Sequence, residues 1–118
     1  MAAPNVINST TVLGKRAYAI LATSMANVIT NGSTSGNLIK VSEVSISNIT
    51  AAQITANVAI GRGSTLYYLA GTIAVPANST LTITSRDTAF YLEEGDYLQA
   101  NTSSASAGHM SVSHEVTY

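Results

Sequence analysis

The stretch that decides the fold is Met110-Ser111-Val112-Ser113-His114-Glu115-Val116, near the carboxyl end of the chain. Apolar residues alternate with polar ones along it, and side chains on a β-strand point to opposite faces with a period of two. The apolar residues therefore share one face with His114, whereas the serines and Glu115 share the other. A half-buried strand requires this pattern, so the sequence predicts a strand over residues 109–117.

Outward from this stretch, short apolar segments recur at intervals of about ten residues, which is typical of antiparallel β-proteins. Turn signals separate them, among them Asn31-Gly32, Gly61-Arg62-Gly63-Ser64 and Pro76-Ala77-Asn78. Residues 22–29 fit either a short helical turn or a strand, because Ala and Met favour helix whereas the Val-Ile pair favours strand. The other expected strands cover residues 15–23, 38–48, 54–60, 66–69, 72–75, 81–84, 89–92 and 97–101.

Eight or nine short strands with almost no helix predict an all-β fold, a single antiparallel β-sandwich. A jelly-roll-like arrangement is preferred because its strand count is eight, and an immunoglobulin-like arrangement is the alternative. The chain has 118 residues, enough for one domain, which we expect to cover residues 15–118. Residues 1–14 are polar and aperiodic, so we expect them to form an extended N-terminal arm.

The strand predicted over residues 38–48 is expected to be irregular. Apolar residues occupy odd positions in its first half and even positions in its second. A β-bulge near Ser42-Glu43 would return both sets to one buried face. With that bulge, the predicted core comprises Ile39, Val41, Val44, Ile46, Val58, Ile60, Leu81, Ile83, Leu98, Val112 and Val116.

Charged residues are scarce in this chain. They make up 9% of it, against roughly 25% in an ordinary soluble domain, whereas hydrophobic residues make up 46%. The surface must therefore consist largely of Ser, Thr, Asn and Ala. Another protein can cover such a surface while little charge is desolvated, so we expect extensive contact with other protein chains.

Several classes of function are disfavoured by composition. The five basic residues are scattered and six acidic residues offset them, so nucleic-acid binding is not expected. The absence of cysteine excludes a disulfide scaffold, a thiolate zinc site and a thiol nucleophile. The most apolar window, residues 17–22, is too short for a membrane span, and from Met1-Ala2-Ala3-Pro4 we expect no secretory signal. We expect a protein made in a cytoplasm and retained or assembled there.

Glu93, Glu94 and Asp96 form the only acidic cluster in the sequence. One interpretation is a cation site or the centre of a metal-dependent hydrolase. The other is a turn in which Gly95 takes a positive φ and the acids face water. Calcium loops need oxygen ligands at regular alternate positions, and glycoside hydrolysis needs two carboxylates across a cleft, neither of which this cluster offers. The turn is favoured, and no catalytic, cofactor-binding or metal-binding residue is expected.

The two histidines, His109 and His114, lie five residues apart and therefore on opposite faces of one strand. They cannot chelate one metal ion as a pair within that strand. Three copies of one histidine could meet on a trimer axis, but the position of His114 on the apolar face favours a core or interface residue.

Tyrosine side chains support a second hypothesis, a carbohydrate- or receptor-binding module. Exposed rings of Tyr67, Tyr68 or Tyr97 could stack on sugars, although tyrosines in strands more often serve ordinary packing and the chain has no Trp. The wider aromatic set adds Phe90, Tyr91 and Tyr118. Asn-x-Ser/Thr triplets begin at Asn8, Asn31, Asn48, Asn78 and Asn101, but without a signal peptide we do not expect glycosylation.

A set of segments spread over residues 38–118 carries a family resemblance. They are Lys40-Val41-Ser42, Ser47-Asn48-Ile49, Tyr67-Tyr68-Leu69-Ala70, Val75-Pro76-Ala77-Asn78-Ser79, Tyr91-Leu92-Glu93-Glu94-Gly95-Asp96 and Val112-Ser113-His114-Glu115. Together they resemble small virion structural proteins of tailed bacteriophages, especially those of cyanophages. The chain departs from that group at His114, where a Ser-Tyr-Glu-type final strand has an aromatic residue.

The resemblance implies a non-enzymatic protein of the virion, made in the cytoplasm of a bacterial host. Capsid decoration (cement) is the expected role, with a neck or tail component as the alternative. The implied partners are the major capsid protein or neck and tail proteins. A homo-oligomer is expected, with a trimer at a three-fold position of a capsid as one candidate. No catalytic residue is transferred by the resemblance.

Overall fold

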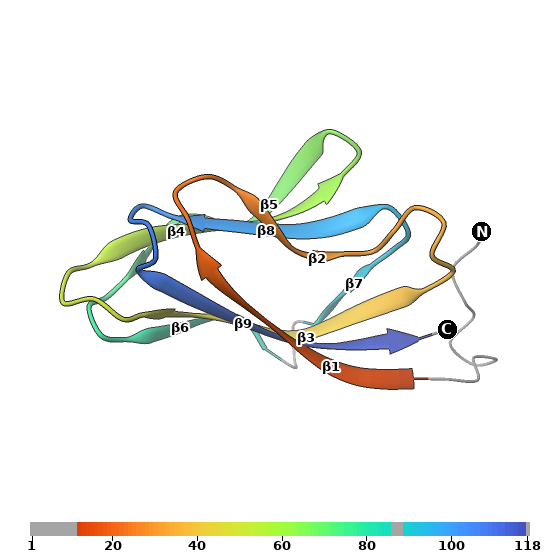
Figure 1. Ribbon diagram of the computed structural model, residues 1–118, viewed down its shortest axis with the longest axis horizontal. Coiled ribbons are helices and arrows are strands. Elements are labelled where there is room, and N and C mark those ends of the chain that lie inside the picture. The colour runs from red at the N-terminus through yellow and green to blue at the C-terminus, as the bar shows by residue number, and fades with distance from the viewer. Residues whose placement is uncertain (1–11, 86–88, 118) are drawn as a thin grey trace.

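The computed structural model describes residues 12–85 and 89–117, which form nine β-strands in two antiparallel sheets. The two sheets lie one above the other, giving the sandwich-like all-β architecture expected from the sequence (Figure 1). One sheet has the order β1 (Val12–Leu21), β9 (Gly108–Thr117), β3 (Leu38–Asn48) and β6 (Thr80–Thr84), and β7 (Phe90–Leu92) also pairs with β3. The other sheet has the order β2 (Ala26–Thr30), β8 (Asp96–Thr102), β4 (Ile54–Arg62) and β5 (Thr65–Val75).

Strands pair in a nested way along the chain. The first pairs with the last, β1 with β9, and inside that pair lie β2 with β8 and then β3 with β6 and β7. The innermost pair, β4 with β5, is a hairpin whose turn projects away from the two layers (Figure 1). The two short strands share one edge of β3, with β7 opposite residues 39–41 and β6 opposite residues 44–47.

The bulge predicted in the third strand is confirmed. The pairing of β3 with β9 shifts between Val41 and Glu43, so Ser42 is the extra residue. The shift changes the parity of the inward positions, and as a result the apolar residues on both sides of it are buried.

The core lies between the sheets, and eight of the eleven predicted core residues are buried in it. Ile60, Leu81 and Ile83 are only partly buried, which the prediction missed. Leu81 and Ile83 belong to β6 at a sheet edge, and Ile60 lies two residues before the end of β4. Core residues outside the prediction include Leu21, Ile29, Ile54, Ala56, Val75, Leu92, Ala100 and Met110.

Some predicted boundaries were wrong. Strand β1 begins at Val12, three residues before the expected start, so residues 12–14 of the expected arm are strand and residues 1–11 lie outside the described residues. The helical alternative for residues 22–29 is wrong, because residues 26–30 form β2. The two segments expected at residues 66–75 are one strand, β5, with Thr72 at a positive φ of 50° inside it.

Within residues 12–85 and 89–117, no helix is long and apolar enough to cross a membrane.

Candidate functional site

The acidic turn between β7 and β8 is the first candidate site. Gly95 has a φ of +89°, which confirms the predicted turn conformation. The expectation that all three acids face water was wrong, because Asp96 is only 1% exposed. A buried carboxylate requires partners, since desolvation of an unpaired charge is costly.

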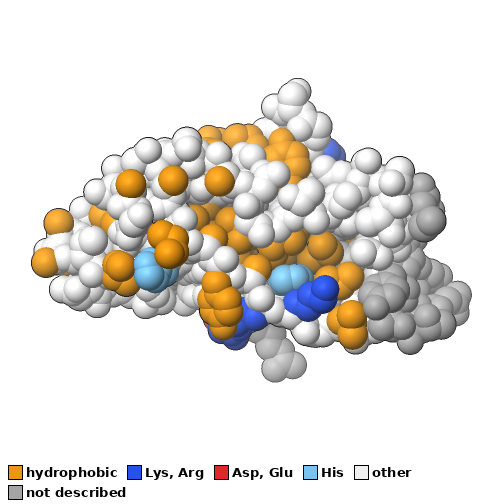
Figure 2. All heavy atoms as spheres, in the orientation of Figure 1, with side chains coloured by type: hydrophobic (Ala, Val, Ile, Leu, Met, Phe, Trp, Pro, Cys, Tyr) orange, Lys and Arg blue, Asp and Glu red, His pale blue; other side chains and the backbone are white. Residues whose placement is uncertain are grey.

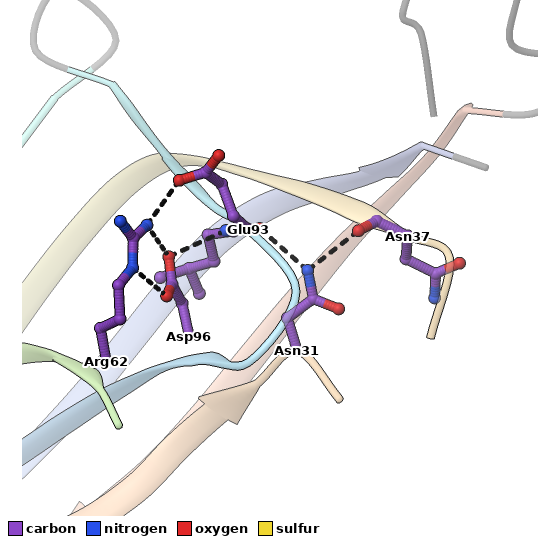
Figure 3. A network of polar contacts seen from close by, with 6 residues as sticks. Asn31, Asn37, Arg62, Glu93 and Asp96 are labelled. Atoms are coloured by element: carbon purple, nitrogen blue, oxygen red, sulfur yellow. Dashed lines mark hydrogen bonds and ion pairs between the residues drawn. The ribbon is translucent and has the colours of Figure 1, made fainter. Parts of the chain in front are cut away.

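Asp96 obtains its partners from Arg62 at the end of β4 (Figure 3). Arg62 Nε donates to Oδ1 at 2.8 Å and Nη2 donates to Oδ2 at 2.8 Å, a bidentate fork, and the backbone N–H of Glu93 donates to Oδ2 at 3.0 Å. These hydrogen bonds, that from Arg62 above all, hold the pKa of Asp96 below its usual value. The same contacts raise the pKa of Arg62, first through Asp96 and then through Glu93.

The other two acids of the turn are also engaged. Glu93 forms an ion pair with Arg62 at the exposed side of the fork, and Glu94 accepts a hydrogen bond of 3.2 Å from the backbone N–H of Gly36. In the described ranges, no group of three or more His, Cys, Asp or Glu residues is placed to hold a metal ion. The arrangement therefore fastens the β7–β8 turn to the end of β4 and to the β2–β3 loop.

Asn31 extends this network into the β2–β3 loop, and sequence reasoning gave it no structural role. Its side chain is 2% exposed, and Nδ2 donates to the carbonyl oxygens of Leu92 at 2.9 Å and Asn37 at 3.0 Å (Figure 3). Its backbone N–H donates to the carbonyl of Asp96 at 2.9 Å, and its own carbonyl accepts from Gly95 at 2.8 Å. One asparagine thus joins the two loops that meet at this end of the sandwich.

Asn48, at the other end of β3, is a second buried asparagine. It is 2% exposed, and its Nδ2 donates to the carbonyls of Ala52 at 2.8 Å and Val75 at 3.1 Å. Its Oδ1 accepts from the backbone N–H and the hydroxyl of Thr50 at 3.0 and 2.7 Å. Asn31 and Asn48 both begin Asn-x-Ser/Thr triplets, and their burial leaves neither side chain accessible to a glycan-transferring enzyme in the folded chain.

The two histidines point to opposite faces of β9, as predicted: His109 is exposed and His114 is 8% exposed. The Nδ1 atom of His114 is buried and finds no hydrogen-bond partner among the described residues. Burial lowers the pKa of His114, and the nearby positive charge of Lys15, its neighbour on β1, lowers it further. His114 is therefore a buried residue, in agreement with the core or interface position that the sequence favours, whereas the alternative of a site on a trimer axis is untested.

The tyrosines divide into exposed and structural side chains. Tyr67 and Tyr91 are 60% and 50% exposed, and they line a hollow of about 310 Å³ together with Ile60, Arg62 and Asp96. Tyr97 is structural, because its hydroxyl donates to the carbonyl of Gly63 at 2.9 Å. Its ring also lies so close to Gly61 that a Cβ atom there would be 2.0 Å from the ring.

Phe90 packs against the core and Tyr68 is 56% exposed, whereas Tyr118 lies outside the described residues.

Exposed apolar side chains concentrate on the two long strands that end their sheets, β1 and β5. Those of β1 are Val12, Leu13, Tyr18 and Ile20, with Tyr18 73% and Ile20 66% exposed; those of β5 are Tyr67, Tyr68 and Leu69. On the face seen in Figure 2, hydrophobic side chains and neutral polar atoms dominate and charged side chains appear at only a few places. The low charge of the sequence is thus a property of this surface.

No protein-family model matches this chain, and no curated protein sequence matches it either. Within residues 12–85 and 89–117, the buried polar side chains of these clusters hold loops together, whereas the exposed apolar side chains of β1 and β5 and the hollow beside Arg62 are open to a partner.

Proposed function

We propose that this protein is a non-enzymatic structural protein of a tailed-phage virion, a capsid decoration protein that binds the capsid lattice. The observation that carries the proposal is the exposure of large apolar side chains along both long edge strands of a chain with 9% charged residues. A monomer that stays alone in solution normally blunts its sheet edges with charges, prolines or bulges. An edge strand that exposes several large apolar side chains is suited to burial against another protein.

The proposal includes a jelly-roll topology for the sandwich. If β6 and β7 together fill one strand position beside β3, eight positions remain, and they pair first with last, second with seventh, third with sixth and fourth with fifth. This nesting is the pattern that a jelly roll produces, and virus capsid and lectin domains use that fold. An immunoglobulin-like topology places the first two strands side by side, whereas here β1 and β2 belong to different sheets.

The proposed partners are the major capsid protein and further copies of this chain, with assembly beginning in the cytoplasm of the bacterial host. Closed symmetry is the usual outcome of such assembly, and a trimer on a three-fold position of the capsid is one form it could take. In this proposal the predicted arm contributes to attachment, and the chain has no catalytic role.

The number of copies per particle tests the proposal. Quantitative mass spectrometry of purified virions should find copies on the order of hundreds, as a repeated capsid lattice requires, with the major capsid protein as internal standard. A count of about six to eighteen would instead assign the chain to the neck or tail, where ring symmetry sets the number. Absence from the particle would overturn the proposal.

A carbohydrate-binding role is the second candidate, and the hollow between Tyr67, Tyr91 and Arg62 is the observation that favours it. Two exposed rings beside polar groups are the elements with which proteins stack and orient sugars. Glycan-array binding that is lost in Tyr67→Ala and kept in Tyr68→Ala would support this role. The two tyrosines are adjacent and similarly exposed, but only Tyr67 lines the hollow.

A further inference from the structure

Strand β1 differs from the other strands that end the two sheets. All ten of its residues pair with β9 in one unbroken register, and among the described residues it has no strand on its other side. At the other edges, β2 and β6 are five residues long, and β5 has two register shifts and a positive φ at Thr72. Thus β1 is the long regular edge with neither a bulge nor a proline, and the charges that a pairing strand must accommodate are Lys15 and Arg16.

The side chains of β1 have a definite order on the outer face of the sheet. Burial increases at Ala17, Ala19 and Leu21, so the odd positions point inward and the even positions point outward. Arg16 confirms this direction, because its Nη1 donates to the hydroxyl of Ser111 on the outer face of β9 at 3.3 Å. The outer face of β1 therefore reads Val12, Gly14, Arg16, Tyr18 and Ile20.

We propose that β1 pairs with β1 of a second copy of this chain, antiparallel and about a two-fold axis, so that the two sheets become continuous. The inference deepens the proposed function, on which it rests, by naming one partner of the assembling subunit. Such a contact is isologous, which means that each residue of one copy meets the same counterpart in the other.

The charges on β1 select the register of this pairing. Residues that lie opposite each other must share a face, and two registers satisfy this while pairing almost the whole strand. One centres on Arg16 and places it directly opposite Arg16 of the second copy, a like-charge pair that destabilises a sheet. The other centres on Ala17, pairs residues 13–21 of both copies and places no like charges directly opposite each other, because Lys15 then faces Ala19 of the second copy.

The register centred on Ala17 also matches the sizes of the side chains. Arg16 lies opposite Tyr18 of the second copy, where a guanidinium and an aromatic ring attract each other, and the contact occurs twice by symmetry. Ile20, 66% exposed, lies opposite Gly14 of the second copy, and no atom lies within 4 Å of the place where a side chain would begin at Gly14. Thus Tyr18 lies opposite a cation, and Ile20 lies opposite a glycine whose missing side chain leaves room for it.

Substitutions at Tyr18 test the proposal with matched variants. The side chain is 73% exposed, so neither Tyr18→Lys nor Tyr18→Glu should disturb the fold. Tyr18→Lys places a cation opposite Arg16 of the second copy and should raise the dimer dissociation constant by about tenfold or more, whereas Tyr18→Glu pairs with that arginine and should keep the dimer. Equal behaviour of the two variants would overturn the proposed register.

Because the chain has no cysteine, a single introduced cysteine can test directly whether the β1 strands of two copies are in contact. Ala17→Cys should form an intermolecular disulfide under mild oxidation, because directly opposite residues have Cα atoms about 4.5–5.5 Å apart, within disulfide range. Ala74→Cys is the control, since Ala74 is exposed on the other long edge strand, β5. Cross-linking of the Ala74 variant instead would assign self-association to β5 and overturn the proposal.

Light scattering of the purified chain at about 100 µM, where even weak self-association populates a dimer, should give twice the mass of one 12.2 kDa chain. A monomer at that concentration would overturn the pairing. If such a monomer occurred in many copies on virions, only the pairing would fail. If a dimer formed but the chain were absent from virions, only the proposed function would fail.

Discussion

A buried asparagine fixes the loops at each end of strand β3, but the two ends differ in the charge of the side chains around that asparagine. At each end a buried asparagine, Asn31 or Asn48, joins two loops by donating to backbone carbonyls of the neighbouring segment. Only the Asn31 end adds charge, through the fork between Arg62 and the buried carboxylate of Asp96. The Asn48 end relies on amide, hydroxyl and backbone groups, the hydroxyl being that of Thr50.

This difference in charge determines which end of the molecule should lose stability in acid. An asparagine amide carries both donors and acceptors and does not titrate, so it satisfies buried carbonyls at every pH. A carboxyl group forms an ion pair with an arginine only while it is ionised, and its contribution to stability therefore depends on pH. The loops at the Asp96 end should loosen in acid, whereas those at the Asn48 end should not.

Conversion of Asn48 to aspartate should have the largest effect of the variants considered. Asn48→Asp places a carboxylate oxygen against the carbonyls of Ala52 and Val75, and the hydrogen bonds from Thr50 offset only part of the cost of this buried charge, which should be about 4 kcal/mol at pH 7. The folded-state pKa of this new acid is raised, so the variant should regain stability as pH falls toward the unfolded-state value of about 3.9.

Urea denaturation at several pH values measures this recovery, with Asn48→Ala as the control. The alanine variant should lose about 2 kcal/mol at every pH, because it removes the hydrogen bonds of the side-chain amide without adding a titrating group. A loss in the aspartate variant that does not shrink in acid would contradict the role given to Asn48.

Removal of the carboxylate at the other end should have the next largest effect. Asp96→Ala leaves the N–H of Glu93 without its acceptor and frees the fork of Arg62, and it should lower the free energy of unfolding by about 3 kcal/mol. Glu93→Gln is the matched control, because Glu93 pairs with Arg62 at the exposed side of the fork and should change stability little. Similar losses in both variants, measured in urea, would refute the distinction between the buried and the exposed acid.

Replacement of Arg62 by lysine tests the fork itself. Arg62→Lys keeps the positive charge but cannot bind Asp96 through two parallel N–H groups. The folded-state pKa of Asp96 is depressed in the native chain, so its stabilising contribution is complete above the unfolded-state value and is lost as pH falls through the folded value. The lysine variant should depress that pKa less, and circular dichroism during acid titration should show unfolding at a higher pH. An unchanged midpoint would exclude the fork as its cause.

Titration of His114 should change the free energy of unfolding least, and this residue lies at neither end of β3. Its folded-state pKa is lowered by burial, so stability should be complete above the unfolded-state value of about 6.5 and should decline as pH falls below it. His114→Phe removes the titrating group while keeping a ring in the core. Urea denaturation between pH 7.5 and about 5 should show a slope in the native chain and none in this variant. A slope that persists in the variant would have to arise from another group.

The structural features that the sequence predicts correctly are those that depend on local periodicity along the chain. Alternation along 110–116 predicts the last strand and the two faces of its histidines, and the parity change within 38–48 predicts the bulge beside Ser42. Gly95 marks the turn because few other residues adopt a positive φ. Each of these features is specified by neighbours within a few residues along the chain.

Features that depend on distant partners were not predictable in this way. Asp96 resembles a solvated turn residue in sequence, and its burial follows from Arg62, which lies 34 residues earlier. Asn31 and Leu92 are 61 residues apart, and no pattern in either segment identifies the contact. Strand order and the pairing of remote loops decide which polar residues are buried, and one sequence does not determine them.

The burial of Asn31 has a consequence for the chemical durability of the protein. Asn31 precedes Gly32, and in an Asn-Gly pair the glycine nitrogen readily attacks the side-chain carbonyl carbon; ammonia leaves, a cyclic imide forms, and water opens it to a carboxyl group. Two hydrogen bonds hold the Asn31 amide against Asn37 and Leu92, so the folded chain keeps it from the geometry of that attack. Peptide mapping after prolonged storage should find Asn31 intact in folded protein and deamidated in urea. The folded state should thereby slow the deamidation of Asn31.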